Sequence, residues 1–393
     1  MPQLRYLTAG ESHGKSLVGI IDGMPAGLSL VAERDIDPIL AERQRGYGRS
    51  HRQKIESDKA EILSGVRFGI TTGAPIAITI TNEDSENWEN KMSVAPIDAE
   101  IKPVTIPRPG HADLAGAIKY RQSDLRNILE RASARETAMR VAIGAVASKF
   151  LKELSIVSVS FVRSIGIVSV SDSARPNELH KLHSVLDASE LRMYDSIAEK
   201  NAKVLIDDAK TNGDTLGGIV EAHFTGLPIG IGSHVQWDRK LDGLIARSVM
   251  SIQAVKAVEI GRGISVAGMR GSECHDAIEI EDGDIARTSN NAGGIEGGMS
   301  DGMPIVVRAA MKPISTLMRP LSSVDLATGE AALSHIERSD ICAVPSLSII
   351  VENVVAFTLA SALLDTFGGD AMAEVQERVA LRREQSKLKN LIL

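Results

Sequence analysis

Aromatic residues are scarce in this sequence, and its charge is acidic. Phe, Trp and Tyr make up 3% of the 393 residues, and the formal net charge is −7. Stacking platforms for bases are therefore few, and the overall charge repels polyanions. We expect neither a nucleic acid nor an anionic membrane surface as a partner.

Cysteines are equally rare, and long apolar runs are not expected. Cys274 and Cys342 stand in no metal-spaced pair, so they are predicted to be reduced thiols, and no metal site is predicted. We expect no apolar run long enough to cross a bilayer, and the stretch MPQLRYLTAG lacks the organisation of a signal peptide. These absences predict a cytoplasmic protein with no membrane partner.

Residues 8–17, TAGESHGKSL, come close to a phosphate-binding P-loop. A P-loop needs four residues between its first glycine and the Gly-Lys-Ser/Thr, whereas three residues separate Gly10 from Gly14. A shorter loop cannot wrap a phosphate chain in the same way. An ATP-dependent phosphotransferase stays open as an alternative, and His13 within the loop needs another explanation.

Three pairs of segments repeat in the same order along the chain. GKSLVGIIDGMPAG at 14–27 resembles GDTLGGIVEAHFTGLPIG at 213–230, and GITTGAPIAI at 69–78 resembles GMSDGMPIVV at 298–307. In the third pair, Glu-Arg precedes a long apolar helical run at 130–151 and again at 337–364. Ordered repeats of this kind indicate duplication of a β/α unit.

The duplication predicts an α+β fold of two related layers, and composition leaves both one large domain and two fused halves possible. Its halves would cover about 1–154 and 205–393, with an inserted connector at about 155–204. Short β-branched segments bounded by Gly, Pro or Asn predict strands in both halves. Apolar residues at helical spacing predict helices over 123–154 and 240–258.

Arginines gather in two segments. Arg43, Arg45, Arg49 and Arg52 lie in the glycine-bearing stretch 41–56. Because glycines let the backbone bend and guanidinium forks bind phosphate and carboxylate bidentately, this loop predicts a substrate that carries both groups. A solvated basic loop is the alternative interpretation.

The second segment, 126–140, mixes arginines with acids at helical spacing. Arg126 with Glu130 and Glu136 with Arg140 have the spacing of structural ion pairs. Arg131 and Arg135 have no such partner, and small neighbouring residues leave space beside them for a ligand.

Two histidines, His13 and His111, stand in glycine-bearing loops near these arginines. PRPGHADL at 107–114 places Arg108 and His111 around a Pro-Gly turn. A lone histidine is more often structural, but imidazole titrates near neutral pH and can hand a proton to a leaving phosphate or a reduced cofactor. Asp340 precedes an apolar helix, where a capping role competes with a functional one.

Longer motifs make the whole chain resemble the chorismate synthase family. The matching stretches span residues 5–345 in family order: GESHGKSL, ERQRGYGRSHRQKIE, PRPGHADLAGAIKY, LERASARETAMRVAIGAVA, GDTLGG, SHVQWDRKLD, NNAGGIEGGMSDGMPIVVRAAMKPIST and ERSDICAVP. The resemblance implies a single domain over residues 1–393 with a β-α-β sandwich core, and a homotetramer. It also matches residues 8–17 to the N-terminal histidine loop of that family.

The resemblance implies the final step of the shikimate pathway, which serves aromatic amino-acid biosynthesis. In this lyase reaction, 5-enolpyruvylshikimate 3-phosphate loses phosphate and its C6 hydrogen by 1,4-anti-elimination to give chorismate. Reduced FMN is required without net redox change, because the flavin donates an electron as phosphate leaves and recovers it as the proton departs. The resemblance leaves open whether NADPH reduces the flavin on the protein or an external reductant does.

Residue roles follow from the same resemblance. His13 would assist the departing phosphate, His111 would sit beside the flavin as a proton donor, and Asp340 would accept the C6 proton by way of flavin N5. The implied substrate contacts are Ser12, Arg43, Arg49, Arg52, Arg108, Arg135 and Arg338. The implied flavin contacts are Arg43, Arg49, Arg131, Ala132, Ser133, Gln253, Ala254, Gly297, Lys312, Pro313, Ile314, Ser315, Thr316 and Arg338.

Two positions depart from the family pattern. Gln253 stands where many members have Asn, and Ala132 stands where many have Ser. A non-catalytic protein that binds flavin or anions is the alternative from a different class. Such a protein would have no use for His13, His111 and Asp340 together.

Overall fold

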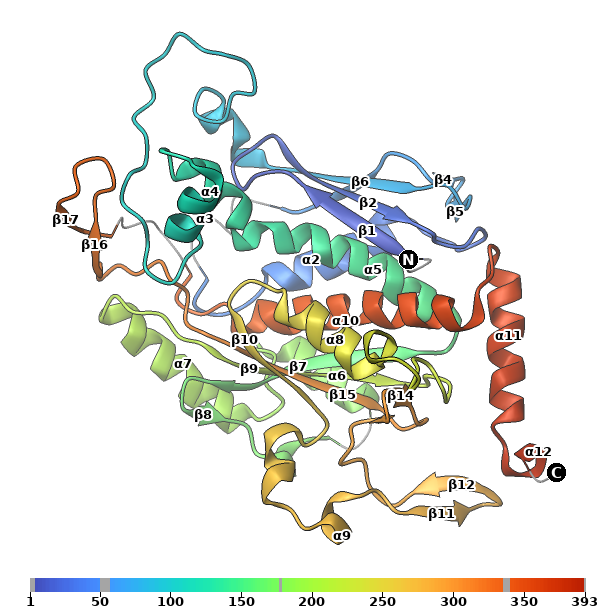
Figure 1. Cartoon of the computed structure of the whole chain (residues 1–393). Coiled ribbons are helices and arrows are strands. Elements are labelled where there is room, and N and C mark those ends of the chain that lie inside the picture. Colours follow the sequence, from blue (N-terminus) through green and yellow to red (C-terminus); the bar gives the residue numbers. More distant parts are fainter. Residues whose placement is uncertain (1–3, 50–56, 177–178, 335–339, 392–393) are drawn as a thin grey trace.

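The protein is described by a computed structural model that covers residues 4–49, 57–176, 179–334 and 340–391. Its main elements form two β-sheets with helices packed between them (Figure 1). Buried apolar side chains from both sheets and from these helices make one contiguous core. The predicted α+β sandwich is confirmed.

The first sheet has the strand order β1-β2-β6-β3, with every neighbouring pair antiparallel. Its strands are β1 (Arg5–Ala9), β2 (Ser16–Asp22), β3 (Ala60–Ile62) and β6 (Ile76–Thr81). Alternation along β6 buries Ile76, Ile78 and Ile80 against the helices and turns the intervening residues outward. The sheet therefore has one core face and one outer face.

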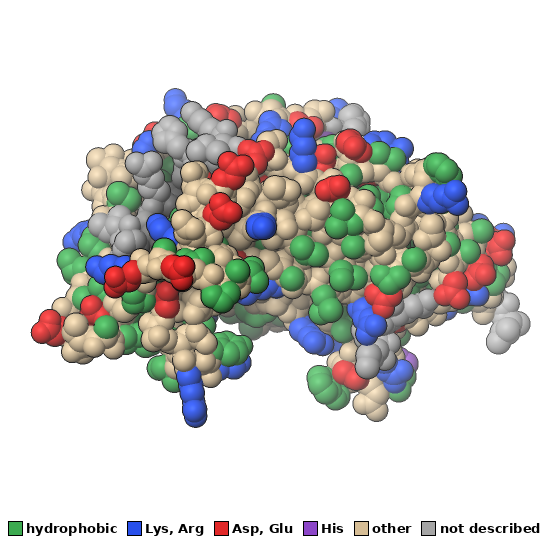
Figure 2. Space-filling model, turned by 90° about the horizontal axis from the view of Figure 1, so that it is seen from above, with side chains coloured by type: hydrophobic (Ala, Val, Ile, Leu, Met, Phe, Trp, Pro, Cys, Tyr) green, Lys and Arg blue, Asp and Glu red, His purple; other side chains and the backbone are tan. Residues whose placement is uncertain are grey.

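The outer face of this first sheet is not covered by any helix in the part of the chain that the structure describes. Leu7 on β1 is 75% exposed and Ile20 on β2 is 42% exposed. A view onto this side of the molecule shows hydrophobic side chains spread among charged ones (Figure 2).

The second sheet has the strand order β10-β15-β9-β7-β8, again antiparallel throughout. Its strands are β7 (Val157–Ile165), β8 (Val168–Ser169), β9 (Gly218–Thr225), β10 (Val255–Ile260) and β15 (Ile305–Met311). On β9, Val220, Ala222 and Phe224 are buried toward the helices, which gives this sheet the same core face and outer face as the first.

The two sheets repeat one another in strand order. The order β1-β2-β6-β3 corresponds to β7-β9-β15-β10, and in each half the pair predicted from the repeated motifs, β2 with β6 and β9 with β15, is hydrogen-bonded. A long helix then follows each set, α5 (Thr137–Glu153) and α10 (Val344–Phe367). The strand order expected of a duplicated unit is therefore present.

The predicted connector, about 155–204, needs correction. It begins with β7, which pairs with β9 and occupies the position that β1 has in the first sheet. The insertion relative to the first half lies after this strand and contains α6 (Leu179–Ala188) and α7 (Ser196–Thr211). Nothing in the β7 sequence resembles β1, so the repeat was invisible at this strand.

Two predicted helices were too long. Residues 123–154 form α4 (Arg126–Ala132), a short 3-10 turn η3 (Ala134–Glu136) and α5, because Ser133 adopts an extended backbone between them. Residues 240–258 form α8 (Leu241–Met250) and then β10. The helix ends at Met250, Ala254 has a left-handed φ of 68°, and the strand that follows it pairs with β15.

Helix α10 corrects a further expectation. This 24-residue helix is long and apolar enough to cross a membrane, with a mean hydropathy of 2.0 over its most apolar 18 residues, contrary to the expectation that no such run exists. Most of its most apolar window, 89%, is buried within the protein. The helix contacts α5, α8, β7 and β9 around its circumference, which explains why all its faces are apolar.

Shorter elements flank or connect these layers. They are α1 (Ala32–Asp35), α2 (Asp37–Gln44), β4 (Val66–Arg67), β5 (Ile70–Thr71), η2 (Glu83–Trp88), α3 (Asp113–Tyr120), η4 (Asp172–Ala174), η5 (Trp237–Arg239), η6 (Gly263–Gly268), α9 (Gly271–Cys274), β11 (Ile278–Glu281), β12 (Asp284–Arg287), β13 (Ile295–Glu296), β14 (Met299–Ser300), β16 (Ser322–Val324), β17 (Ala331–Leu333), α11 (Met372–Gln385) and α12 (Leu388–Leu391).

Helices α5 and α10 approach most closely at Gly144. A Cβ atom at this position would lie 2.4 Å from the carbonyl oxygen and from the Cβ atom of Asn353 on α10. Real Cβ atoms are not found this close to backbone, so only glycine permits the observed separation of the two helices.

We predict that Gly144→Ala lowers the free energy of unfolding by about 1–3 kcal/mol, since the added methyl must push the helices apart. The control is Gly243→Ala on α8, where the nearest neighbouring atom is 3.8 Å away. There the better helix propensity of alanine should raise stability by up to about 1 kcal/mol. Urea unfolding followed by circular dichroism measures both, and equal midpoints would contradict the close contact.

Candidate active site

One cavity of about 320 Å³ lies where the two halves meet, and most of the predicted site residues line it. This volume is at the lower end of the range for small-molecule sites. The predicted residues on its wall are Ser12, His13, Arg43, Arg49, Arg108, His111, Ala132, Ser133, Arg135, Gln253, Ala254, Lys312, Pro313, Ile314, Ser315, Thr316 and Asp340. Residues more than 300 positions apart in the sequence thus share one site.

Four predicted residues are not placed at this cavity. Arg52 and Arg338 lie outside the described residues. Arg131 points away, because its guanidinium donates to the carbonyl oxygens of Gly10 (3.1 Å) and Thr8 (2.9 Å). Gly297 lies in the exposed turn between β13 and β14, away from the cavity wall. Arg131 therefore ties the turn after β1 to α4, and the predicted flavin contacts of Arg131 and Gly297 stay predictions.

His13 is held by Glu130 of α4. The Nδ1 atom of His13 lies 2.9 Å from Oε2 of Glu130, and the backbone N–H of His13 donates to the same oxygen at 2.9 Å. An Nδ1–H that donates to a carboxylate leaves Nε2 as the ring nitrogen for a ligand. Burial alone would raise the pKa of Glu130, but the hydrogen bond and charge of His13 and the charge of Arg126 hold it below its ordinary value.

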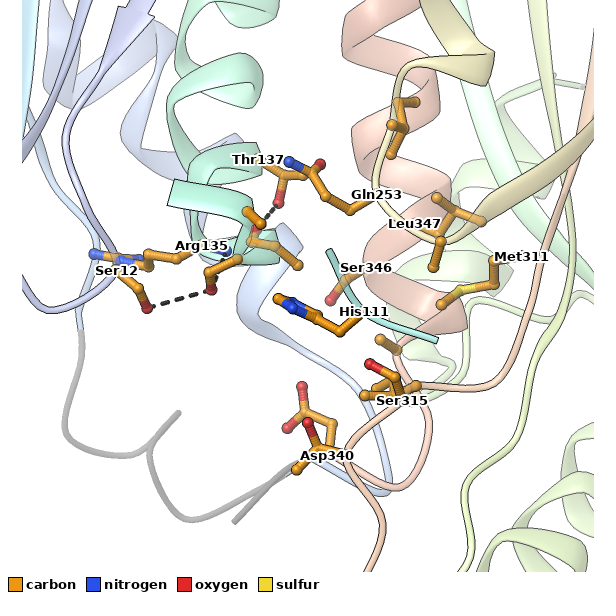
Figure 3. Close-up of a pocket in the computed structure, with 18 of the residues that line it drawn as sticks. Ser12, His111, Arg135, Thr137, Gln253, Met311, Ser315, Asp340, Ser346 and Leu347 are labelled. Carbon is orange, nitrogen blue, oxygen red and sulfur yellow. Dashed lines mark hydrogen bonds between the residues drawn. The ribbon is translucent and has the colours of Figure 1, made fainter. Parts of the chain in front are cut away.

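His111 has the same arrangement with Asp113 at the start of α3. Its Nδ1 atom lies 2.5 Å from Oδ1 of Asp113, and Nε of Arg108 donates to the other carboxylate oxygen at 3.0 Å. Burial would raise the pKa of Asp113, but His111 and Arg108 hold it well below its usual range. The close-up shows the ring of His111 projecting into the cavity between Ser12 and Arg135 on one side and Ser315 on the other (Figure 3).

Arg43 and Arg135 share one buried carboxylate, Asp58. Arg135 Nη1 lies 2.6 Å from Asp58 and Arg43 Nη1 lies 3.6 Å from it. Arg43 also donates to Thr137 Oγ1 at 2.9 Å, and Arg135 Nε donates to Asn82 at 2.9 Å. Burial lowers the pKa of Arg43 to about 10, so it stays charged at neutral pH. Two cations with one carboxylate leave the wall of the cavity positive.

Arg49 contacts Asp340, with 3.2 Å between Nη1 and Oδ2. The Nε atom of Arg49 is buried and has no hydrogen-bond partner among the described residues. Five cationic side chains line the cavity, Arg43, Arg49, Arg108, Arg135 and Lys312, whereas Asp340 is the carboxylate on its described wall. Such an excess favours an anionic ligand.

Residues 311–316 form the opposite wall and combine apolar and polar atoms. Lys312 donates through Nζ to the carbonyl oxygen of Gly110, and burial lowers its pKa. Gln253 donates to Glu136 at 3.1 Å, which leaves its buried Oε1 atom without a partner in the part of the chain described. The apolar side chains of Leu129 on α4, Met311 on β15 and Leu347 on α10 also line the cavity.

The first turns of α5 and α10 also face the cavity. Ala134 and Thr137 border it at the start of α5, and Ala343 and Ser346 do so at the start of α10. Helix N-termini carry partial positive charge from unpaired backbone N–H groups, so both helices reinforce the preference for anions.

Comparison with known proteins agrees with this geometry. The family model described as chorismate synthase matches residues 4–364. A protein named chorismate synthase from Syntrophotalea carbinolica is 52% identical over 380 residues, covering 96% of this chain and 97% of its own length. One from Aquifex aeolicus is 53% identical over 383 residues, covering 95% and 96%. The chain belongs to the chorismate synthase family.

A solved structure supports the same conclusion for the fold. A chorismate synthase crystal structure is 45% identical, covers 98% of both chains and superposes with a TM-score of 0.78. The two residues that were expected to depart from the family pattern, Ala132 and Gln253, both line the cavity.

Sequence analysis missed three carboxylates that organise this chorismate synthase site. Glu130 was predicted to pair with Arg126, which is confirmed at 2.9 Å, but its contact with His13 was not foreseen. Asp113 could have been found from the His-Ala-Asp spacing after the Pro-Gly turn. Asp58 gave no signal, because both of its partners are distant in the sequence.

We predict that Asp58→Asn lowers the free energy of unfolding by about 3–5 kcal/mol, because two buried guanidiniums lose the carboxylate that they share. The matched control is Asp22→Asn, which removes the exposed ion pair with Arg5 and should cost at most about 1 kcal/mol. Urea titration at neutral pH compares the two variants. If Asp58→Asn lowers the free energy of unfolding no more than Asp22→Asn does, the stabilising role of Asp58 is contradicted.

Proposed function

We propose that this chain converts 5-enolpyruvylshikimate 3-phosphate to chorismate and phosphate. The observation that carries the proposal is the pair of histidines, His13 and His111, each fixed through Nδ1 by a carboxylate in a cavity rich in cations. A substrate with a phosphate and two carboxylates suits that charge. Membership of the chorismate synthase family supplies the reaction.

Reduced FMN is the proposed cofactor, and the residues present fit it. The apolar lining residues Leu129, Met311 and Leu347 suit a flat ring, the free Oε1 atom of Gln253 suits an N–H donor, and Lys312 supplies a cation for a phosphate. When bound, reduced flavin supplies an electron to the substrate as phosphate leaves and recovers it as C6 loses its proton.

The protein side chains have separate tasks in this scheme. Arg49 and its neighbouring cations bind the anionic groups and orient the ring of the substrate. His13 donates a proton from Nε2 to the departing phosphate oxygen, and Glu130 stabilises the charged imidazole. His111 holds a proton at the flavin side of the cavity. Asp340, whose negative charge is balanced by Arg49, accepts the proton that C6 loses.

We also propose that the protein is a cytoplasmic homotetramer. The uncovered outer face of the first sheet, with Leu7 and Ile20 exposed, supports contact with another copy of the chain. Either NADPH or an external donor supplies the reduced flavin, and comparing turnover with NADPH and free FMN against dithionite-reduced FMN distinguishes the two sources.

The deciding experiment is an anaerobic assay of chorismate formation with chemically reduced FMN. Formation of chorismate supports the proposal. Binding of FMN and substrate without any product would favour the non-catalytic flavin- or anion-binding protein instead. Tight ATP binding that requires magnesium would favour the phosphotransferase.

Arg49→Ala should raise the Kd for substrate at least about ten-fold, the scale of one lost charge-assisted hydrogen bond. The control, Arg45→Ala, changes a neighbouring arginine that lies off the cavity wall and donates to the carbonyl oxygen of Asp187. Calorimetry in the presence of oxidised FMN measures the Kd for substrate in both variants. Unchanged binding in Arg49→Ala would argue against this arginine as a substrate ligand.

His13→Ala and His111→Ala should each lower the elimination rate at least about 10²-fold, the usual contribution of a positioned general acid. Substrate and oxidised FMN should still bind together, because the four arginines and Lys312 that line the cavity remain in both variants. Single-turnover kinetics and flavin absorbance measure the two properties, with the exposed His183→Ala as control. Parent rates in both variants would refute the catalytic assignment.

A further inference from the structure

Trp88 stacks on the ring of His13, although neither the motifs nor the proposed reaction involve it. The two ring centroids are 4.0 Å apart and the planes meet at 28°. Trp88 ends the 3-10 helix η2, which follows β6, and its Nε1–H donates to Asp84 at 3.0 Å. A tryptophan from the first half is thus fixed against the histidine of the N-terminal loop.

This contact closes a ring of interactions around His13. Glu130 binds Nδ1 of His13, and Arg126 donates to Glu130 at 2.9 Å. The guanidinium carbon of Arg126 lies in turn 5.0 Å from the centroid of Trp88. Each of these four residues therefore contacts two others of the set.

The stacking supplies a constraint that the hydrogen bond lacks. A bond at Nδ1 fixes the position of one ring atom, but the terminal torsion of histidine is broad, so the imidazole plane can still turn about that contact. A flat indole packed at 4.0 Å selects one plane. With Nδ1 and the plane both fixed, the direction of Nε2 is fixed as well.

Trp88 itself does not line the cavity, whereas His13 does. Its effect on the reaction must therefore pass through the histidine. We propose that Trp88 is a positioning residue that holds the imidazole of His13 in the plane from which Nε2 serves the departing phosphate. This inference rests on the proposed role of His13.

The kinetic test compares Trp88→Leu with Trp88→Phe. Leucine keeps apolar bulk but cannot stack, so kcat should fall at least about ten-fold while KM changes less than about two-fold. Phenylalanine restores a flat ring and should recover kcat to within about three-fold of the parent. In a His13→Ala background, Trp88→Leu should have no further effect, because the residue to be positioned is gone.

A second measurement needs no flavin and no turnover. The chain has two tryptophans, and Trp237 is 81% exposed on the surface, so Trp237→Phe leaves Trp88 as the sole tryptophan. A protonated imidazole ring in stacking contact quenches indole emission, and the proposed role of His13 as an acid requires this protonated form. The emission lifetime of Trp88 should therefore lengthen when His13→Ala is added, and Trp237→Phe alone should keep the parent kcat.

The outcomes separate this inference from the proposed function. If Trp88→Leu keeps the parent kcat while His13→Ala is inactive, the positioning role is wrong and the proposed function stands. An unchanged lifetime in His13→Ala, or an equal loss from Trp88→Leu in the His13→Ala background, would also overturn it, since Trp88 would then serve only the local fold. Full activity in His13→Ala would overturn this inference together with the catalytic role of His13, while the conversion to chorismate would stand.

Discussion

The contact between α5 and α10 is the constraint on which the rest of the structure depends. Each helix covers the core face of one sheet, and the two meet where Gly144 lies against the backbone of Asn353. Because the helices cannot separate without opening both sheets, the first turns of α5 and α10 are held beside each other. The cavity lies at those two helix starts. Its position, and the positive potential that the helix N-termini add to its wall, therefore follow from the same packing that forms the core.

Much of the fold could be predicted because the duplication repeats local chemistry. Glycine and proline mark the same turns in both halves, and strands of β-branched residues follow them in the same order. The prediction failed where local signals were absent or misleading. The sequence of β7 does not resemble β1, and Ala254 adopts a left-handed backbone that an alanine gives no reason to expect. Residues 255–260, which follow Ala254, form a strand because they pair with β15.

The site was predictable for residues that carry charge in a recognisable motif, and less so for the residues that orient them. His13, His111 and Arg49 stand in glycine-bearing loops that motif reasoning can find. Asp58 and Trp88 act across sequence separations that no spacing rule covers. Arg131 shows a different limit of spacing rules, because it has no i,i+4 partner on its helix but donates to the backbone carbonyl oxygen of Gly10. Motifs identified the reacting groups, and the three-dimensional contacts identified what holds them.

The position of α10 in the chain has a consequence for synthesis on the ribosome. Residues 344–367 are made after all the strands of both sheets, yet they supply the surface that the second sheet and α5 bury. Until they emerge, the nascent chain exposes apolar faces that have no covering helix. The segment that emerges is itself apolar enough to be mistaken for a membrane span. Rapid docking of this helix, or its protection by a chaperone, is therefore a requirement of the architecture.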